Sequence, residues 1–455
     1  MLCFHVMNEH GITDAADDYT PWRAAKFYVP LLIQAVSQSL TYPLVAAIVS
    51  HGKNGVVDLA AFAQGQVVMF VIGALGGGLL TTGMVFGRDA EGFRQFKRLN
   101  RWVTTTLIVV QGLVCIHPLD TVVFHMVLGL QAPMDETARE VLFFSIPLQL
   151  FFFLRNAPLV ALYNARASAA ANWATLCRIA LTAMLTPLFL RMGWSGCLMG
   201  TLAMTGPVLV ETILAQLLAA PYIRALKSDA PRPADIRTQF LFSIPLSFGG
   251  VLLAVSGFMI GAFITRAPDP TRMLPIHYIT MGVVNPVGFA ALRMQAVALS
   301  FPPMSKDDHR VFKFAIVAGC LLSLFPLVGQ IPSVARWYFG AIQNLPASDI
   351  PLAMHAMLLV SILPIIQSLR GHAEGFAAWR KRPNAILAGQ AMNLASLVCT
   401  LFIALNLGTP GYLMGVIAIL VAVVMTLITI RMGLVWAEME DLFGRPPRGV
   451  RGAEG

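Results

Sequence analysis

The feature that most constrains this chain is a succession of long apolar segments separated by short clusters of charge. A helix that crosses a bilayer needs about 20 mostly apolar residues. Twelve segments meet that requirement, near 27–50, 60–86, 102–118, 141–163, 172–191, 197–220, 240–264, 275–300, 312–331, 352–377, 384–407 and 410–435. Only 12% of the residues are charged, against about 25% in soluble proteins. The sequence therefore predicts an all-α integral membrane protein with twelve transmembrane helices.

The polar stretches between these segments divide the chain. We expect a cytoplasmic N-terminal segment at 1–26, an N-lobe of six spans at 27–223, a cytoplasmic linker at 224–239, a C-lobe of six spans at 240–437 and a cytoplasmic tail at 438–455. Segments 119–131 and 333–346 are only moderately apolar, and we interpret them as interfacial helices. The first 26 residues lack the basic start and short apolar core of a cleaved signal peptide.

The basic residues predict the orientation of the bundle. Loops on one side carry 21 Lys and Arg residues, whereas loops on the other carry six. Because basic loops stay in the cytoplasm, both termini are expected there, in a multi-pass protein of the plasma (inner) membrane. The formal net charge of +9 thus reflects topology, which argues against nucleic-acid binding.

An internal repeat relates the two halves. The segment Gly193–Gly200 matches Gly408–Gly415 at five of eight positions, at an offset of 215. The same offset relates Leu154-Arg155 to Leu369-Arg370, Pro30-Leu31 to Pro245-Leu246, and Phe86 to Phe301. A six-span unit enters and leaves on the same side, so the duplicated halves are expected to be parallel, related by an axis along the membrane normal. Such pairs place a substrate site between the halves, which rock alternately.

Four segments carry a resemblance to a known family. They are Phe27-Tyr-Val-Pro-Leu-Leu-Ile33, Gly83-Met-Val-Phe-Gly-Arg-Asp89, Gly288-Phe-Ala-Ala-Leu-Arg293 and Leu369-Arg-Gly-His-Ala-Glu-Gly-Phe-Ala-Ala-Trp-Arg-Lys-Arg382. They resemble the progressive ankylosis (ANK) family of the multidrug/oligosaccharidyl-lipid/polysaccharide (MOP) exporter superfamily, whose fold is MATE-like. The likeness is diffuse but covers all twelve spans.

The resemblance implies export of anionic metabolites such as nucleotides, carboxylates and pyrophosphate. It carries over Arg293 in span eight and Arg370 in span ten. The arginines that the family places in spans one and seven have no counterpart here, where the sequence reads Ser37-Gln-Ser-Leu-Thr41 and Ser256-Gly-Phe-Met-Ile-Gly261. The acidic cation site of MATE transporters is also missing from span one, because residues 27–50 hold no Asp or Glu.

Charged side chains within the spans are few. A charge at the bilayer centre costs about 2.5–3.5 kcal/mol on insertion scales. We identified the basic residues Arg155, Arg178, Arg293 and Arg370, against two mid-span acids, Glu211 and Glu374. This excess of arginine favours an anionic solute, because guanidinium binds carboxylate and phosphate bidentately. The alternative is that these arginines reach a membrane surface or pair structurally.

Two polar stripes are candidates for binding. In span ten, Gln367, Arg370 and Glu374 share one helical face. Glu374 either neutralises Arg370 or acts as a protonatable partner that couples transport to a proton or cation. In span one, Gln34, Ser37, Gln38 and Thr41 form a stripe that must face protein or a wet cavity. Interhelical hydrogen bonding is the alternative for the stripe. In span eight, Asn285 precedes Pro286 and is expected to face the same cavity.

These observations favour one class of function. The dispersed histidines supply no acid/base or metal cluster, and no Walker motif is present. We therefore expect no enzyme activity, no cofactor and no metal site. The leading hypothesis is a secondary-active exporter of a small organic or phosphate-containing anion. The alternatives are a lipid-linked glycan flippase, a multidrug efflux transporter and, more remotely, a non-transporting structural subunit. The predicted substrate-binding residues are Gln34, Gln38, Thr41, Asn285, Arg293, Gln367 and Arg370, with Glu374 setting the charge and Arg155 and Ser37 as further candidates.

Overall fold

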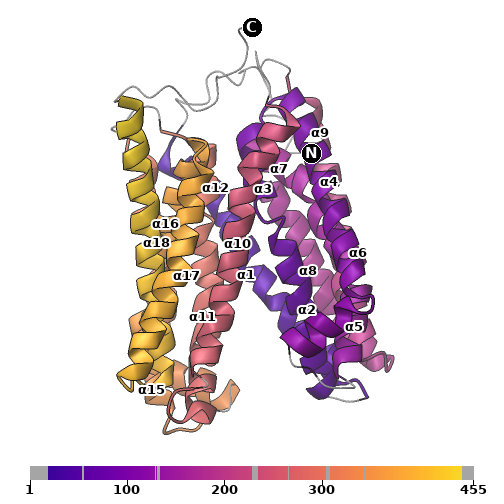
Figure 1. Cartoon of the computed structure of the whole chain (residues 1–455), viewed down its shortest axis with the longest axis vertical. Helices are drawn as coiled ribbons and strands as arrows, with labels where there is room; N and C mark the ends of the chain where they lie inside the picture. The colour runs from indigo at the N-terminus through magenta and orange to yellow at the C-terminus, as the bar shows by residue number, and fades with distance from the viewer. Residues whose placement is uncertain are drawn as a thin grey trace.

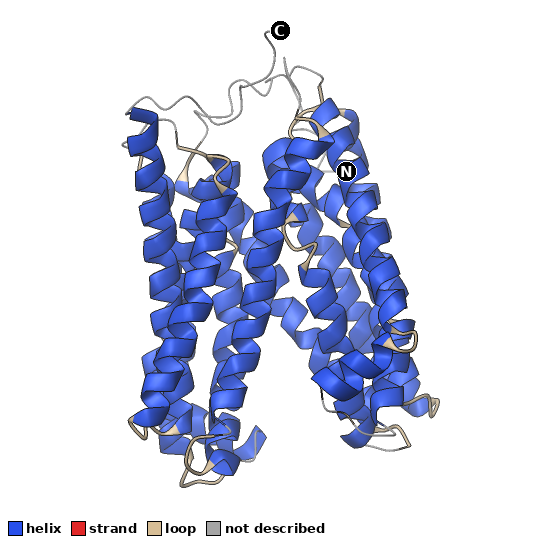
Figure 2. Cartoon of the chain, in the orientation of Figure 1, coloured by secondary structure: helices blue, strands red, loops and turns tan. Residues whose placement is uncertain are grey.

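The computed structural model describes residues 19–53, 56–128, 130, 134–227, 234–264, 266–303, 308–342 and 345–442. Within these ranges the regular secondary structure is entirely helical (Figure 2). The predicted terminal segments lie largely outside the described residues. Helix α1 begins at Pro21, six residues before the predicted start, because Thr20 caps it by accepting a hydrogen bond from Arg23 N at 3.2 Å. Helix α18 ends at Leu442, beyond the predicted boundary at 437.

The helices of the first half follow in the order α1 Pro21–Ser50, α2 Val56–Ala74, α3 Leu79–Phe86, α4 Ala90–Val114, the π-helical turn η2 Thr121–Val127, α5 Met134–Phe144, α6 Ile146–Leu154, α7 Asn156–Asn164, α8 Ser168–Arg191 and α9 Cys197–Arg224. Two predicted spans are therefore interrupted. Span two breaks between α2 and α3, and span four breaks at Ser145 and at Arg155.

The second half repeats this order. It contains α10 Ile236–Ile264, α11 Pro270–Leu292, α12 Met294–Ser300, α13 Arg310–Leu327, η3 Val328–Gln330, α14 Pro332–Ala335, the π-helical turn η4 Arg336–Ile342, α15 Ile350–Val360, α16 Leu363–Trp379, α17 Pro383–Asn406 and α18 Gly411–Leu442. Span eight breaks at Arg293, between α11 and α12. The turns η2 and η4 coincide with the segments predicted to be interfacial.

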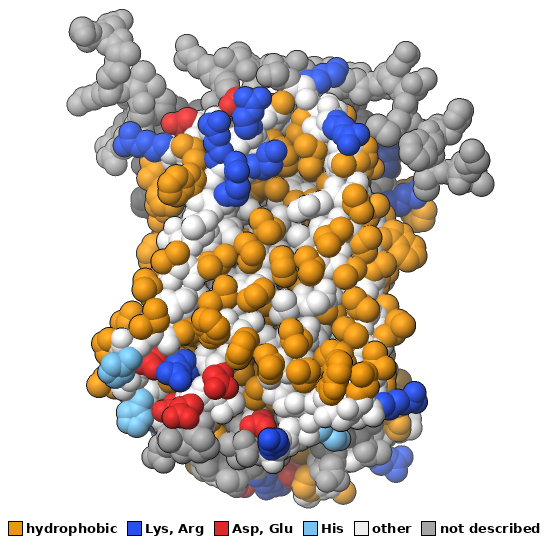
Figure 3. Space-filling model, turned by 90° about the vertical axis from the view of Figure 1, so that its right-hand side faces the viewer, with side chains coloured by type: hydrophobic (Ala, Val, Ile, Leu, Met, Phe, Trp, Pro, Cys, Tyr) orange, Lys and Arg blue, Asp and Glu red, His pale blue; other side chains and the backbone are white. Residues whose placement is uncertain are grey.

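Ten of the twelve expected spans are long and apolar enough to cross a membrane on their described residues alone. The other two correspond to α1 and α4. Helix α1 has 30 residues, but several of its side chains lie outside the description. Helix α4 has 25 residues, and its first half carries Arg94, Lys97, Arg98 and Arg101. The charged first half of α4 therefore lies outside the apolar layer. Figure 3 shows an apolar band between Lys and Arg side chains at one end and mixed charges at the other.

The predicted duplication is visible in the backbone. Helices α8 and α17 both have 24 residues and begin 215 positions apart, as do α1 and α10, and η2 and η4. Left-handed backbone conformations recur at the same offset. Arg166 and Lys381 both have φ of 56°, and Gly193 and Gly408 have φ of 71° and 66°. The fold class predicted from the sequence, two homologous six-helix bundles, is confirmed.

The two bundles converge at the end where the basic loops lie, here called the basic end, and diverge toward the other end (Figure 1). Contacts at the basic end are reciprocal. The Arg166 guanidinium of the first half lies 4.2 Å from the Phe301 ring centroid of the second, and Lys381 Nζ of the second half lies 5.3 Å from the Phe86 centroid of the first. Since both pairs differ by the repeat offset, a pseudo-two-fold axis between the halves relates them, as the parallel repeat predicts.

Hydrogen bonds reinforce the convergence. Arg88 Nη2 donates to Leu299 O at 2.8 Å, and Arg166 Nε donates to Ser300 O at 3.1 Å. Deeper in the bundle the backbones of α3 and α10 approach closely at Gly78, where an added Cβ would lie 2.7 Å from Leu246 Cβ. A small residue there lets the helices pack closely. The bundles thus meet at the basic end and at mid-depth.

Candidate functional site

A cavity of about 590 Å³ lies between the two bundles and is lined by residues of both. Helices α1, α3 and α7 line it from the first half, and α11 and α12 from the second. Most lining side chains are apolar, among them Leu31, Met84 and Phe289. The polar groups are few: Thr81, Tyr163, Asn285, Arg293 and Gln295. A mostly apolar pocket with a few convergent polar groups is typical of a small-molecule site.

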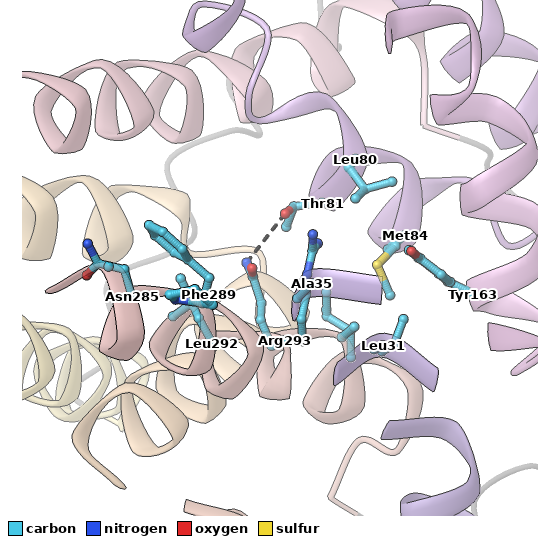
Figure 4. Close-up of a pocket in the computed structure, with 15 residues that line it drawn as sticks. Leu31, Ala35, Leu80, Thr81, Met84, Tyr163, Asn285, Phe289, Leu292 and Arg293 are labelled. Carbon is cyan, nitrogen blue, oxygen red and sulfur yellow. Dashed lines mark hydrogen bonds between the residues drawn. The ribbon is translucent and has the colours of Figure 1, made fainter. Parts of the chain in front are cut away.

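Arg293 is the charged residue of this central cavity. It occupies the break between α11 and α12, and Figure 4 shows it between Leu292 and Ala35, with Thr81 facing it across the cavity. Over the part of the chain that is described, no hydrogen bond or ion pair holds its guanidinium. Gln295 Nε2 donates to Thr81 Oγ1 at 3.4 Å nearby. A guanidinium without a countercharge in an apolar cavity creates a site for an anion.

Asn285 lines the same cavity from α11, two helical turns before Arg293. The structure thus brings together two of the residues predicted from span eight. Pro286 follows Asn285, so the carbonyl four residues before it, at Gly282, lacks its usual intrahelical donor. Gly282 also lines the cavity, which gives this wall a hydrogen-bond acceptor about three helical turns from Arg293.

Gln34 does not face the central cavity, contrary to the prediction. Its side chain is 2% exposed and lies inside the first half. There Tyr163 Oη donates to Gln34 Oε1 at 2.9 Å, and Gln34 Nε2 donates to Thr175 Oγ1 at 2.9 Å. Leu31 and Ala35 present the cavity-facing side of α1 instead. Interhelical hydrogen bonding, the alternative considered for this stripe, therefore accounts for Gln34. The side chains of Ser37 and Gln38 lie outside the described residues.

The Gln34 contacts continue into a buried charge cluster. Thr175 Oγ1 donates to Glu211 Oε1 at 2.6 Å, while Arg155 Nη1 and Arg178 Nη1 donate to Glu211 Oε2 at 2.6 Å and 3.1 Å. The Glu211 carboxylate on α9 thus faces two guanidiniums, that of Arg178 on α8 and that of Arg155 at the α6–α7 break. Because Tyr163 lines the central cavity, an unbroken chain of hydrogen bonds connects this cluster to it.

A second cavity, of about 390 Å³, adjoins the cluster within the first half. Arg155, Arg178 and Thr41 line it, together with Gln149. Thr41 Oγ1 and Gln149 Nε2 are buried without a hydrogen-bond partner among the described residues. Thr41 therefore faces a cavity, as predicted, but a cavity inside one bundle and not the one between the bundles.

Arg370 and Glu374 form a closed arrangement within the second half. Arg370 Nε donates to Glu374 Oε1 at 2.8 Å, Arg370 Nη2 donates to Gln390 Oε1 at 3.0 Å, and Gln390 Nε2 donates to Glu374 Oε1 at 2.8 Å. The side chains of Arg370 and Glu374 are 3% and 6% exposed. Neither residue lines the central cavity. This is the ion pair that the structural alternative predicted.

Gln367 lies one turn before Arg370 on α16. Its Cγ would lie 3.9 Å from a Cβ added to Gly288 of α11, as would Leu363 Cδ2. Its Oε1 is buried without a hydrogen-bond donor among the described residues. It too lies apart from the central cavity.

The repeat explains the relation between the two charge clusters. Positions 155, 175, 178 and 211 of the first half correspond to 370, 390, 393 and 426 of the second. Asn393 Nδ2 donates to Thr426 Oγ1 at 3.0 Å, where the first half has Arg178 and Glu211. The carboxylate that balances Arg370 comes from α16 itself. These positions thus hold two guanidiniums and one carboxylate in the first half, but one guanidinium and no carboxylate in the second, where Glu374 occupies the position that corresponds to Leu159.

Sequence reasoning missed several residues of the central cavity. Thr81, Tyr163 and Gln295 are ordinary polar residues near span ends, and no spacing in the sequence distinguished them. Arg431 on α18 was also missed as an intramembrane arginine. No group of three or more His, Cys, Asp or Glu residues within the described ranges could hold a metal ion.

Solved structures with a similar fold are transporters. The chain superposes with a TM-score of 0.69 on a MOP superfamily transporter from Pyrococcus furiosus, for which a reversed polarity of the binding pocket was taken to suggest a different function; the identity is 15%, over 95% of this chain and 98% of that one. A MATE transporter in the straight conformation gives a TM-score of 0.70 at 16% identity, covering 95% and 98%. A eukaryotic MATE transporter gives 0.69 at 18%, covering 91% and 95%. No protein-family model and no characterised protein sequence matches the chain. The similarity identifies the fold as that of MATE transporters.

Proposed function

We propose that this chain is a secondary-active transporter that exports a small organic or phosphate-containing anion by alternating access between its two six-helix lobes. We place the lobes at 27–223 and 240–437, joined by a cytoplasmic linker at 224–239. The basic end would face the cytoplasm, with both termini on that side of the plasma (inner) membrane. The observation that carries the proposal is Arg293, whose guanidinium lies in the cavity between the lobes with no countercharge among the described residues.

The shape of the molecule supports alternation. The lobes contact each other at the basic end and diverge at the other (Figure 1), which corresponds to one of the two states such a cycle requires. The contacts at the basic end are pairs such as Arg166 with Phe301. Cation–π contacts of this kind are worth about 0.5–2 kcal/mol each. They are weak enough to break and re-form during transport.

The cavity lining indicates what the anion resembles. Arg293 supplies one positive charge, whereas Leu31, Met84, Phe289 and Leu292 supply apolar surface. An anion with an apolar portion fits this lining better than a small, fully hydrated one. The same apolar surface favours a second candidate, transport of an amphipathic solute such as a drug or a lipid-linked glycan precursor. Among solved structures of this fold, one is described by the reversed polarity of its binding pocket, so the fold is compatible with pockets of different polarity.

Two experiments test the proposal in sequence. A comparison of metabolites in medium and cells, with and without overexpression, identifies the exported compounds. Purified protein in liposomes is then assayed for uptake of those anions. Arg293→Ala should raise the KM by about ten- to a hundredfold, since a hydrogen bond to a charged group is worth about 1.5–3 kcal/mol. Arg293→Lys should rescue part of the loss.

A matched control is Arg336→Ala, which removes an exposed arginine at the opposite end whose Nε donates to the backbone of its own segment. Its flux should equal that of the wild type. Uptake of every exported anion by Arg293→Ala at the wild-type rate would contradict the proposed site. Absence of any flux in wild-type liposomes would favour a structural subunit.

A further inference from the structure

A third cavity, of about 550 Å³, lies in the second lobe at the basic end, away from the central cavity. Helices α13, α16 and α18 form its walls, and we call it the α13–α18 pocket. Aromatic rings dominate the lining. Phe376 stacks on Trp379 with ring centroids 5.7 Å apart, and His372 stacks on Phe376 at 6.4 Å. Trp side chains such as Trp379 are enriched at membrane–water interfaces, at the level of the lipid headgroups.

Arg431 supplies the positive charge of the pocket. Its guanidinium lies 5.1 Å from the Phe312 centroid, and its Nη2 is 3.2 Å from His372 Nδ1. In the described part of the chain, no carboxylate lies within ion-pair distance of Arg431. Asp308 also lines the pocket, but both of its oxygens accept hydrogen bonds from Arg310, each at 2.9 Å. The pocket therefore presents a half-buried guanidinium whose charge is balanced by no acid among the described residues.

The surroundings of the pocket are suited to lipid. On α13, Val317 and Leu321 are 58% and 63% exposed, and on α18, Met432 and Val435 are each 54% exposed. In a membrane protein these apolar faces contact acyl chains. Arg431 lies near the level of the basic loops. A lipid whose phosphate reaches Arg431 would thus keep its chains along α13 and α18.

The repeat shows that the fold itself does not require these residues. The positions 215 residues before Arg431, His372 and Arg380 hold Gln216, Ala157 and Ala165. At these positions of α16 and α18 the first lobe therefore lacks the cationic and ring side chains that line the pocket. We infer that the α13–α18 pocket binds the phosphate group of an anionic membrane lipid, through Arg431 and the aromatic wall beside it.

The experiment uses the full-length protein in detergent, with bound lipid counted by native mass spectrometry. Phosphatidylglycerol should bind in preference to phosphatidylcholine. Arg431→Gln should weaken phosphatidylglycerol binding about fivefold or more, given the contribution of a single arginine near a membrane surface, and Arg431→Lys should retain part of it. The control Arg101→Gln removes an exposed arginine beside Trp102 at the basic end of the first lobe, and should leave binding unchanged.

A soluble arm distinguishes the source of the phosphate. Glycerol 3-phosphate, titrated against the same protein, should bind far more weakly than the lipid. If it binds as tightly as phosphatidylglycerol, the site takes a free phosphate ester and the lipid inference is wrong. Equal phosphatidylglycerol binding by the wild type and Arg431→Gln would also overturn it. Thermal unfolding of lipid-free Arg431→Gln identifies misfolding, and in that case the comparison of Arg431→Lys with the wild type decides.

Discussion

The substitution Glu211→Gln tests the energetic account of the first-lobe charge cluster. Glu211 accepts hydrogen bonds from Arg155 at 2.6 Å, Arg178 at 3.1 Å and Thr175 at 2.6 Å. The side chains of Arg178 and Glu211 are only 4% and 2% exposed. Removing the carboxylate leaves the Arg155 and Arg178 guanidiniums close together without the anion that they share. Breaking a buried pair on one side costs about 3–5 kcal/mol, so we expect a loss of this size.

The second lobe provides a matched comparison. Glu374 accepts from one guanidinium, that of Arg370, and from the neutral amide of Gln390. After Glu374→Gln, Arg370 still donates to Gln390. The two substitutions differ by one charged hydrogen bond, worth about 1.5–3 kcal/mol. Glu211→Gln should therefore be the more destabilising by that amount. Arg178→Gln should be milder than Glu211→Gln, because it leaves Arg155 and Glu211 as a neutral pair.

Thermal unfolding of the purified variants, followed by intrinsic fluorescence under identical detergent conditions, ranks them. The expected order of Tm is wild type, Arg178→Gln, Glu374→Gln and then Glu211→Gln. The reasoning fails if Glu211→Gln unfolds within about a degree of the wild type, since even 1 kcal/mol shifts Tm by degrees in domains of this kind. It also fails if Arg178→Gln is the most damaging of the three.

Three further predictions follow from other contacts. The double variant Arg370→Gln/Glu374→Gln should fold and retain flux where each single variant expresses poorly, because the two opposite charges are removed together. A double variant that is stable but does not transport would indicate that these residues act in substrate binding or coupling. Gly78→Ala should slow transport while leaving binding at Arg293 intact, because its Cβ would lie 2.7 Å from Leu246 Cβ and Ser243 O, and unchanged flux would show that the lobes do not need this close contact. The Arg272 side-chain hydrogen bond holds the pKa of Asp349 below its usual range, so the pair stabilises the protein above the unfolded-state pKa of about 3.9 and loses this effect as the pH falls through the lowered pKa. The Tm difference between wild type and Arg272→Gln should therefore be present at neutral pH and shrink at acid pH. A Tm difference that does not depend on pH would contradict the assignment.

The sequence was sufficient for the architecture because the constraints on a membrane fold are one-dimensional. Apolar length predicts spans, and a repeat at one offset, as between Gly193 and Gly408, predicts two matching bundles. The breaks within the spans were harder to predict from the sequence. A helix interrupted at Arg293 or Arg155 retains the same apolar run, so hydropathy alone does not reveal it.

The site was predicted in part, for reasons of helical rotation. Asn285 and Arg293 were assigned to a cavity from the cost of exposing polar groups to lipid, and both line the central cavity. The same cost applies to Gln34, but its amide avoids lipid by hydrogen bonding to Thr175 and Tyr163 inside the lobe. An amide that must avoid lipid can face either a cavity or another helix, and spacing along one helix does not distinguish these directions.

The most direct test of alternating access is the reactivity of a cysteine placed in the central cavity. Thr81 lines that cavity near the basic end. In a background without the six native cysteines, Thr81→Cys in oriented vesicles is exposed to a membrane-impermeant thiol reagent from one side at a time. The lipid-facing Val317→Cys serves as the unreactive control. Our account predicts that Thr81→Cys reacts from either side, because the cavity opens to each in turn. Reaction from one side alone, under conditions in which the same protein transports its anion, would contradict it.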